Sequence, residues 1–265
     1  MTALGRLPEH LSVDDPSAPF LRRSWRYTTR RVLRRIRELL GDDPLFLPIV
    51  LRATPIGTAR RITDETELVI EGFPRSGNTF ATFALQHASD AAGVAVVVAS
   101  HVHTPSQVRL ALTQRFPTLV LVRPPLDTVA SLLIAAPHVR FDAALAEYVH
   151  HYREIWPWHD RCVVATFDQV ITDFGAVTKR LNAQFGTDFP CFETTSEHVA
   201  EVFAAIERNH EILHGGTENV VPRPSVPRQA EKAWLVEQLS GPCHRDLLAV
   251  ADAVYADFAR VAASR

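Results

Sequence analysis

A glycine-bearing turn with one arginine, Phe73-Pro74-Arg75-Ser76-Gly77, separates a short apolar run from a segment with helical character. The backbone N–H groups at the start of such a helix point at one spot, and the helix dipole adds roughly half a positive charge there. The stretch from Gly72 to Thr79 fits the G-x-x-x-x-G-x-T outline of a nucleotide-binding P-loop, but Asn78 stands where the phosphate-binding lysine belongs. We therefore predict an anion-binding turn whose cation is Arg75.

A second basic group follows another apolar run. Arg123 comes directly after residues 118–122, and Ser131 lies in the helix that Pro124 and Pro125 begin. Ligands of parallel α/β sheets bind beyond the carboxyl ends of the strands, so an arginine and a serine placed there can share one phosphate group. The alternative is a salt bridge between Arg123 and Asp127, with Ser131 as a surface hydroxyl.

Two histidines, His101 and His103, follow the β-branched run 94–100. A histidine at this position suits a general base, because its pKa lies near neutral pH. The i, i+2 spacing also suits a metal, but no third ligand stands nearby in the sequence, so we predict no metal. The alternative is a hydrogen-bonded polar residue at a strand end.

Short apolar runs alternate with helical segments along most of the chain, which favours a parallel sheet covered on both faces. We predict an α/β fold, a three-layer α/β/α arrangement with a central parallel sheet. An N-terminal extension is expected over 1–64 and the α/β domain over 65–265. The expected strands are 67–70, 94–100, 118–122 and 161–167, and the expected helices are 78–92, 105–115, 125–135, 141–156, 174–185, 196–209, 229–239 and 245–262.

The chain has 265 residues and a net charge of −2, which gives no reason to expect nucleic acid as a partner. Its three scattered cysteines are typical of reduced thiols in a cytoplasmic protein, and we see neither a signal peptide nor a membrane span. Arg22–Arg37 holds eight arginines, and apolar residues recur among them at helical spacing, which predicts a basic amphipathic helix. We interpret it first as a solvated surface helix, and alternatively as a contact with an acidic lipid, an anionic substrate or a nucleotide.

Together these motifs resemble the sulfotransferase family that uses 3′-phosphoadenosine-5′-phosphosulfate as donor. Pro74–Phe80 is similar to the family's phosphosulfate loop, P-[KR]-S-G-[TN]-T-[WF/L], and Val122–Ser131 is similar to its 3′-phosphate motif, V-R-x-P-x-D-x-x-x-S. The resemblance implies a P-loop-like phosphosulfate-binding loop and no required metal. It assigns the 5′ phosphosulfate to Arg75, Ser76, Gly77, Asn78, Thr79 and Phe80, and the 3′ phosphate to Arg123 and Ser131.

The same resemblance leaves the base open between two histidines. Ser100-His101 is similar to the family's [ST]-H and has the better spacing, whereas His103-Thr104-Pro105 is similar to an H-x-P found in some members. The family's late R-K-G-x-x-G signature is missing, and we expect Arg223 and Arg228 to replace it.

The resemblance covers roughly residues 68–186 and predicts in-line sulfuryl transfer, with a histidine base, to an acceptor hydroxyl or amine. The acceptor is expected to be a small molecule, a carbohydrate or a lipid. Alternatives are a P-loop-type kinase acting on a small molecule, or a non-catalytic binding protein with the nucleotide fold. The expected location is cytoplasmic, with peripheral membrane contact through Arg22–Arg37 as an option.

Overall fold

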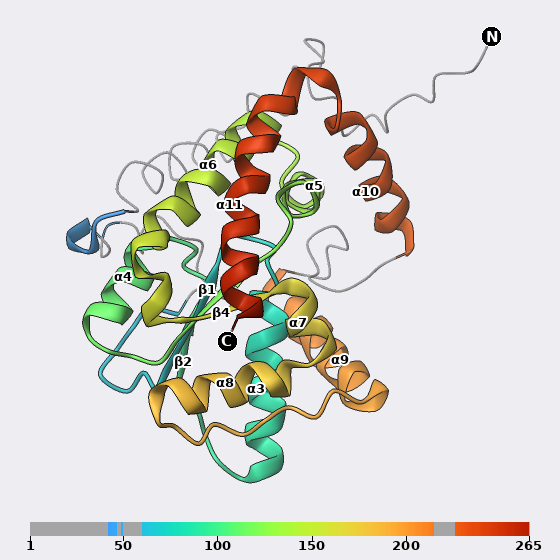
Figure 1. Ribbon diagram of the computed structural model, residues 1–265. Helices are drawn as coiled ribbons and strands as arrows, with labels where there is room; N and C mark the ends of the chain where they lie inside the picture. The colour runs from blue at the N-terminus through green and yellow to red at the C-terminus, as the bar shows by residue number, and fades with distance from the viewer. Residues whose placement is uncertain (1–41, 47–48, 50–59, 215–225, 265) are drawn as a thin grey trace.

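A four-stranded parallel sheet forms the centre of the protein (Figure 1). The computed structural model describes residues 42–46, 49, 60–214 and 226–264. The strand order is β2-β1-β3-β4, so the chain leaves β1 toward one edge and later returns to β1's other side. The carboxyl ends of β1 and β3 therefore flank a topological switch point, where ligands of such sheets bind. The strands are β1 Leu68–Gly72, β2 Val98–Ser100, β3 Thr118–Val122 and β4 Val163–Thr166.

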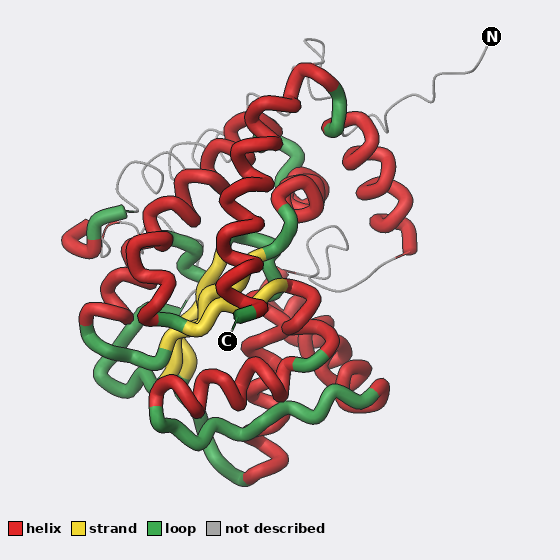
Figure 2. The backbone as a smooth tube through the Cα atoms, viewed as in Figure 1, coloured by secondary structure: helices red, strands yellow, loops and turns green. Residues whose placement is uncertain are grey.

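Helices cover both faces of the sheet, which confirms the predicted three-layer α/β/α fold (Figure 2). On one side of the sheet, a single core cluster joins α4 Pro105–Thr113, α5 Pro125–Ala135, α6 Phe141–Ile155, α11 Arg245–Ala263 and, packed on α5, α10 Val226–Leu239. On the other side, a second cluster joins α3 Asn78–Ala92, α7 Phe167–Thr172, α8 Phe174–Phe185 and, packed on α3, α9 Ser196–His214. Within the described residues, the short 3-10 helices are η1 Pro44–Phe46, η2 Trp156–Arg161 and η4 Pro242–His244.

The central strand β3 shows why its sequence is apolar without interruption. Leu119 and Leu121 lie in the core on the side of α3 and α8, whereas Val120 and Val122 lie in the core on the side of α5 and α6. All four side chains are fully buried. Burial on both faces removes the alternation that a half-exposed strand would show.

Strand β2 is shorter than its β-branched sequence predicts. Only Val98–Ser100 pairs with β1, while Val94 and Val97 are 48% and 41% exposed. The partner sets the length, because β1 begins at Leu68, which lies opposite Val98. The Val97 carbonyl still accepts from the Glu67 N–H at 2.9 Å, but the β-branched residues before Val97 have no parallel ladder to join.

Two further element boundaries differ from the prediction. The fourth strand ends at Thr166, where a capping box formed by Thr166 and Gln169 starts α7, so Phe167 is helical. Helix α10 begins at Val226, so Arg228 lies in its first turn and not in an extended loop. Arg223, Arg22–Arg37 and most of the expected N-terminal extension lie outside the described residues.

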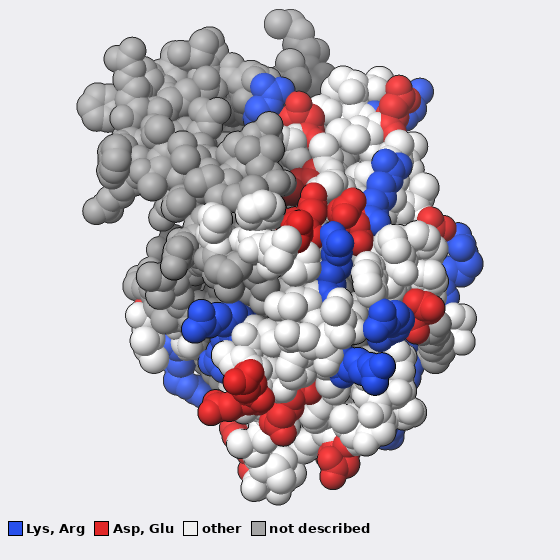
Figure 3. Space-filling view, turned by 90° about the vertical axis from the view of Figure 1, so that its left-hand side faces the viewer, with Lys and Arg blue, Asp and Glu red and all other residues white. Residues whose placement is uncertain are grey.

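The described surface carries charges of both signs. On the face seen in Figure 3, Lys and Arg side chains alternate with Asp and Glu side chains over the described residues. None of the helices in the described residues is long and apolar enough to cross a bilayer.

Candidate functional site

The turn after β1 has a backbone that places its amides at the start of α3. Arg75 and Gly77 adopt left-handed conformations, with φ of 73° and 101°, and the Ser76 N–H donates to the Phe73 carbonyl at 3.2 Å. A Cβ at Gly77 would approach the Phe167 ring to 3.2 Å, so both conformation and space favour glycine. The helix that follows starts at Asn78 with its N–H groups at the turn, as an anion cradle requires.

The side chains of the predicted loop differ in burial, since those of Arg75 and Thr79 are partly exposed. Ser76, Asn78 and Phe80 are buried, and the Phe80 ring packs against Phe192 and Phe203 in the core. These three residues therefore offer a ligand their backbone groups and not their side chains.

One buried tyrosine holds the loop in place. The Tyr152 hydroxyl donates to the Leu121 carbonyl at 2.7 Å, accepts from the Phe73 N–H at 3.2 Å and lies 3.2 Å from Ser76 Oγ. Burial raises the pKa of Tyr152, so the hydroxyl keeps its proton. One turn earlier on α6, the Tyr148 hydroxyl donates to the Arg123 carbonyl at 2.7 Å. The i, i+4 tyrosine pair was the sequence signal for this support, and sequence reasoning missed it.

Replacing Tyr152 by phenylalanine should destabilise the protein, because the Leu121 carbonyl and the Phe73 N–H would stay buried without their partner. We expect a loss of about 1–3 kcal/mol in the free energy of unfolding, measured by urea denaturation. Tyr255→Phe is the matched control, since the Tyr255 hydroxyl makes no hydrogen bond within the described residues. Equal effects of the two substitutions would contradict the role given to Tyr152.

The two predicted arginines meet at the carboxyl ends of β1 and β3. Arg75 Nε donates to Ser131 Oγ at 3.0 Å, and Arg123 Nη1 donates to the Arg75 carbonyl at 3.0 Å. The Arg123 guanidinium stacks 3.9 Å from the centre of the Phe167 ring. Its Nε is buried and has no hydrogen-bond partner among the described residues. An orphaned buried donor of this kind indicates a missing acceptor.

Two more cations come from α10. Arg228 is only 8% exposed. The pKa of Arg75 is lowered to about 10, first by the burial of Arg75 itself and then by the charges of Arg228 and Arg123. One turn after Arg228, Lys232 Nζ lies 2.6 Å from Asp127 Oδ1. Burial lowers the pKa of Lys232, as do the charges of Arg123 and Arg75, while Asp127 opposes the shift. Four cations thus gather in a partly buried place. Such a cluster suits a multivalent anion.

His101 lies between two hydroxyl groups. Its Nδ1 is 2.8 Å from Ser100 Oγ, and its Nε2 is 3.0 Å from Thr79 Oγ1 of the loop. Burial, with a smaller contribution from the charge of Arg60, lowers the pKa of His101 to about 4. The ring is therefore neutral at pH 7.

His103 is held from the backbone side. Its Nδ1 donates to the Gly72 carbonyl at 2.8 Å and lies 3.7 Å from Glu71 Oε2. In its neutral form the ring therefore carries its proton on Nδ1 and its lone pair on Nε2. The fully buried Glu71 carboxylate accepts from the N–H groups of Val102 at 2.8 Å and His103 at 3.0 Å, and from Gln107 Nε2 at 2.9 Å. Sequence reasoning missed Glu71, although an acid inside an apolar strand was its signal.

Both histidines have left-handed backbone conformations, with φ of 64° at His101 and 56° at His103, and their ring centres are 5.6 Å apart. Such conformations cost about 1–3 kcal/mol each and gather at functional sites. The hydrogen bonds that the Glu71 carboxylate accepts from the Val102 and His103 N–H groups compensate, because they hold the bend that brings both rings to the loop.

The lowered pKa of His101 predicts a loss of stability in acid. Between pH 6.5 and pH 4 the unfolded chain binds a proton at His101 that the folded protein does not bind. The free energy of unfolding should therefore fall with falling pH by up to about 3 kcal/mol across this window. Urea titrations of the wild type and His101→Gln at pH 7 and pH 4.5 measure the difference. Parallel pH dependence of the two proteins would contradict the prediction.

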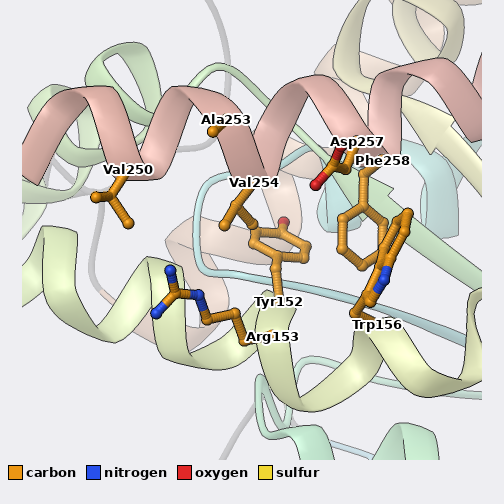
Figure 4. A pocket seen from close by; sticks show the side chains of 8 residues that line it. All are labelled: Tyr152, Arg153, Trp156, Val250, Ala253, Val254, Asp257 and Phe258. Atoms are coloured by element: carbon orange, nitrogen blue, oxygen red, sulfur yellow. The ribbon is translucent and has the colours of Figure 1, made fainter.

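A groove elsewhere on the molecule has a different character. It holds about 340 Å³ between α6 and α11 (Figure 4), and no residue of the anion-binding turn lines it. Its lining is mainly aliphatic and aromatic. Nowhere in the described residues do three His, Cys, Asp or Glu side chains come together in an arrangement that could hold a metal ion. The convergent cations and histidines, and not this groove, form the candidate site. The groove is lined by Tyr152, Arg153, Trp156, Val250, Ala253, Val254, Asp257 and Phe258.

Neither a family model nor a curated protein matches this sequence. Among solved structures, the chain is similar to mouse sulfotransferase SULT7A1 complexed with PAP, with a TM-score of 0.37 and 12% identity over 72% of this chain and 90% of that chain. A likeness at this level carries no argument about function. The function has to be inferred from the site residues themselves.

Proposed function

We propose that the protein transfers a sulfuryl group from 3′-phosphoadenosine-5′-phosphosulfate to an acceptor hydroxyl or amine. The observation that carries this proposal is the meeting of Arg75, Arg123 and Ser131 beside the N-terminus of α3. These residues come from separate segments, each of which matches a phosphate motif. A donor with phosphate groups at both ends of its ribose needs two such motifs side by side.

The residues present fit this donor. Arg123, Ser131 and Arg228 would hold the 3′ phosphate, which would supply the acceptor that the orphaned Arg123 Nε lacks among the described residues. The N–H groups from Gly77 to Thr79 would hold the 5′ phosphosulfate. Arg75 lies between the two, because its backbone belongs to the turn and its guanidinium reaches Ser131.

His103 is the better candidate for the base on geometry. Because His103 Nδ1–H donates to the Gly72 carbonyl, the ring is fixed in place and its basic lone pair is on Nε2. By contrast, a pKa of about 4 makes His101 a weak base, and both of its nitrogens face hydroxyl groups. We assign His103 to proton removal and His101 to the orientation of Thr79.

In the proposed step, the acceptor oxygen or nitrogen forms a bond to sulfur as the bond from sulfur to the bridging phosphate oxygen breaks. The acceptor proton passes to His103 Nε2, and adenosine 3′,5′-bisphosphate leaves. Arg75 and the α3 amides stabilise the negative charge that builds up on the bridging oxygen. Positioning and electrostatics supply most of the rate, as in phosphoryl transfer.

Thermal unfolding with two nucleotides tests the proposal. Adenosine 3′,5′-bisphosphate at one hundred times its Kd should add about 2.7 kcal/mol of stability, which corresponds to a rise in Tm of about 5–10 °C. ATP with Mg²⁺ should give a smaller rise, because it lacks the 3′ phosphate. Selective stabilisation by ATP and Mg²⁺ would instead support the kinase alternative.

A further inference from the structure

Lys232 lies on α10 and forms an ion pair with a residue next to the candidate anion site. Helices α10 and α5 pack against each other, and the Lys232–Asp127 pair joins them at 2.6 Å. Asp127 lies in the first turn of α5, directly after the β3 end that carries Arg123. Lys232 is therefore attached to the segment that holds Arg123 and Ser131.

The charges around Lys232 make its position costly without an anion. Asp127 is its carboxylate partner, but the same carboxylate also acts on Arg123. Burial lowers the pKa of Arg123, and the charges of Asp127 and Asp168 oppose that shift. Arg123 and Arg75 both repel the Lys232 ammonium. Asp127 is thus shared between two cations, and a dianion bound beside Arg123 would offer Lys232 twice the negative charge that Asp127 carries.

The Lys232 side chain is suited to exchange one ion-pair partner for another. An ammonium is a compact point charge on a flexible four-carbon stem, whereas a guanidinium is a rigid planar fork. The Lys232 side chain is 24% exposed, and that of Asp127 is 45% exposed, so neither is locked by packing. Arg228, one turn away, is almost fully buried and cannot swing in the same way.

We propose that Lys232 is a specificity-determining residue that binds the 3′ phosphate of the nucleotide and pairs with Asp127 when no nucleotide is bound. This inference rests on the proposed function. It predicts that Lys232 contributes to the affinity for nucleotides that carry a 3′ phosphate and not to the affinity for those that carry only a 5′ phosphate. Asp127 then acts as a competitor for Lys232 and not as its required partner.

Titration calorimetry with adenosine 3′,5′-bisphosphate and adenosine 5′-monophosphate tests the inference. Lys232→Gln should weaken bisphosphate binding about 10- to 100-fold and change monophosphate binding less than about twofold. Asp127→Asn should leave bisphosphate binding as tight as in the wild type or tighter. Arg260→Gln is a matched control, because it removes an exposed ion pair with Asp257 within α11, and it should change neither affinity.

Lys232→Gln is expected to weaken bisphosphate binding, whereas Asp127→Asn is expected to leave it unchanged or strengthen it. This difference distinguishes a binding role of Lys232 from a purely structural one. If the ion pair only docks α10 on α5, Lys232→Gln and Asp127→Asn should weaken bisphosphate binding alike, and the inference is overturned. Unchanged bisphosphate affinity in Lys232→Gln also overturns it, as does equal weakening of both ligands. A wild type that does not prefer the bisphosphate over the monophosphate would instead overturn the proposed function. Urea midpoints of each variant show that the folded protein was measured.

Discussion

Replacing His103 by alanine is expected to lower kcat for sulfuryl transfer by about 100- to 10,000-fold and to leave the Kd for adenosine 3′,5′-bisphosphate within about twofold of the wild type. The reason is that His103 Nε2 takes the acceptor proton, whereas the bisphosphate is held by arginines and backbone amides. Turnover of a panel of hydroxyl and amine acceptors with radiolabelled donor measures kcat, and calorimetry measures Kd.

His101→Ala is the companion variant for this prediction. It should cost less in kcat than His103→Ala, because His101 orients Thr79 and does not receive the proton. Loss of turnover in His101→Ala with retained turnover in His103→Ala would return the role of base to His101, as the motif spacing favours. The pH profile gives a second readout, since a base with a pKa of about 4 would let kcat/KM fall only in strong acid.

Arg123→Ala is expected to weaken binding of adenosine 3′,5′-bisphosphate by about 10- to 100-fold and to raise the donor KM more than it lowers kcat. Its guanidinium is positioned before binding by the Phe167 ring and by the Arg75 carbonyl, and its Nε has no acceptor within the described residues. Calorimetry with the bisphosphate, and with adenosine 5′-monophosphate for comparison, measures the effect.

Arg161→Ala is the control for Arg123. Arg161 likewise lies over an aromatic ring, that of Trp158, and donates to a carbonyl, that of Leu112, but at the opposite end of β4. It should leave both nucleotide affinities unchanged. If Arg123→Ala weakened the monophosphate as much as the bisphosphate, the assignment of Arg123 to the 3′ phosphate would be wrong.

Local signals in the sequence determined much of the fold. The bounds of α3, α5, α8 and β3 agree with the predicted bounds, because prolines, glycines and continuous apolar runs act over a few residues. Gly186, in a left-handed conformation, ends α8 as expected. The capping box at Thr166 is equally local and readable from the sequence, and it makes Phe167 helical although the apolar run predicts a strand there.

The same local signals placed the anion-binding turn and Arg123 at neighbouring strand ends. They did so because parallel strands direct their carboxyl ends to one edge, whatever the details of packing.

Only the tertiary structure decided which partners these residues have. The length of β2 follows from where β1 begins, and the proton position on His103 follows from the Gly72 carbonyl, with Glu71 holding the backbone. Lys232 meets Asp127 only because α10 packs on α5. Propensity and turn chemistry act within a few residues, whereas burial, charge and hydrogen bonding depend on groups that are distant in sequence and are brought together by packing.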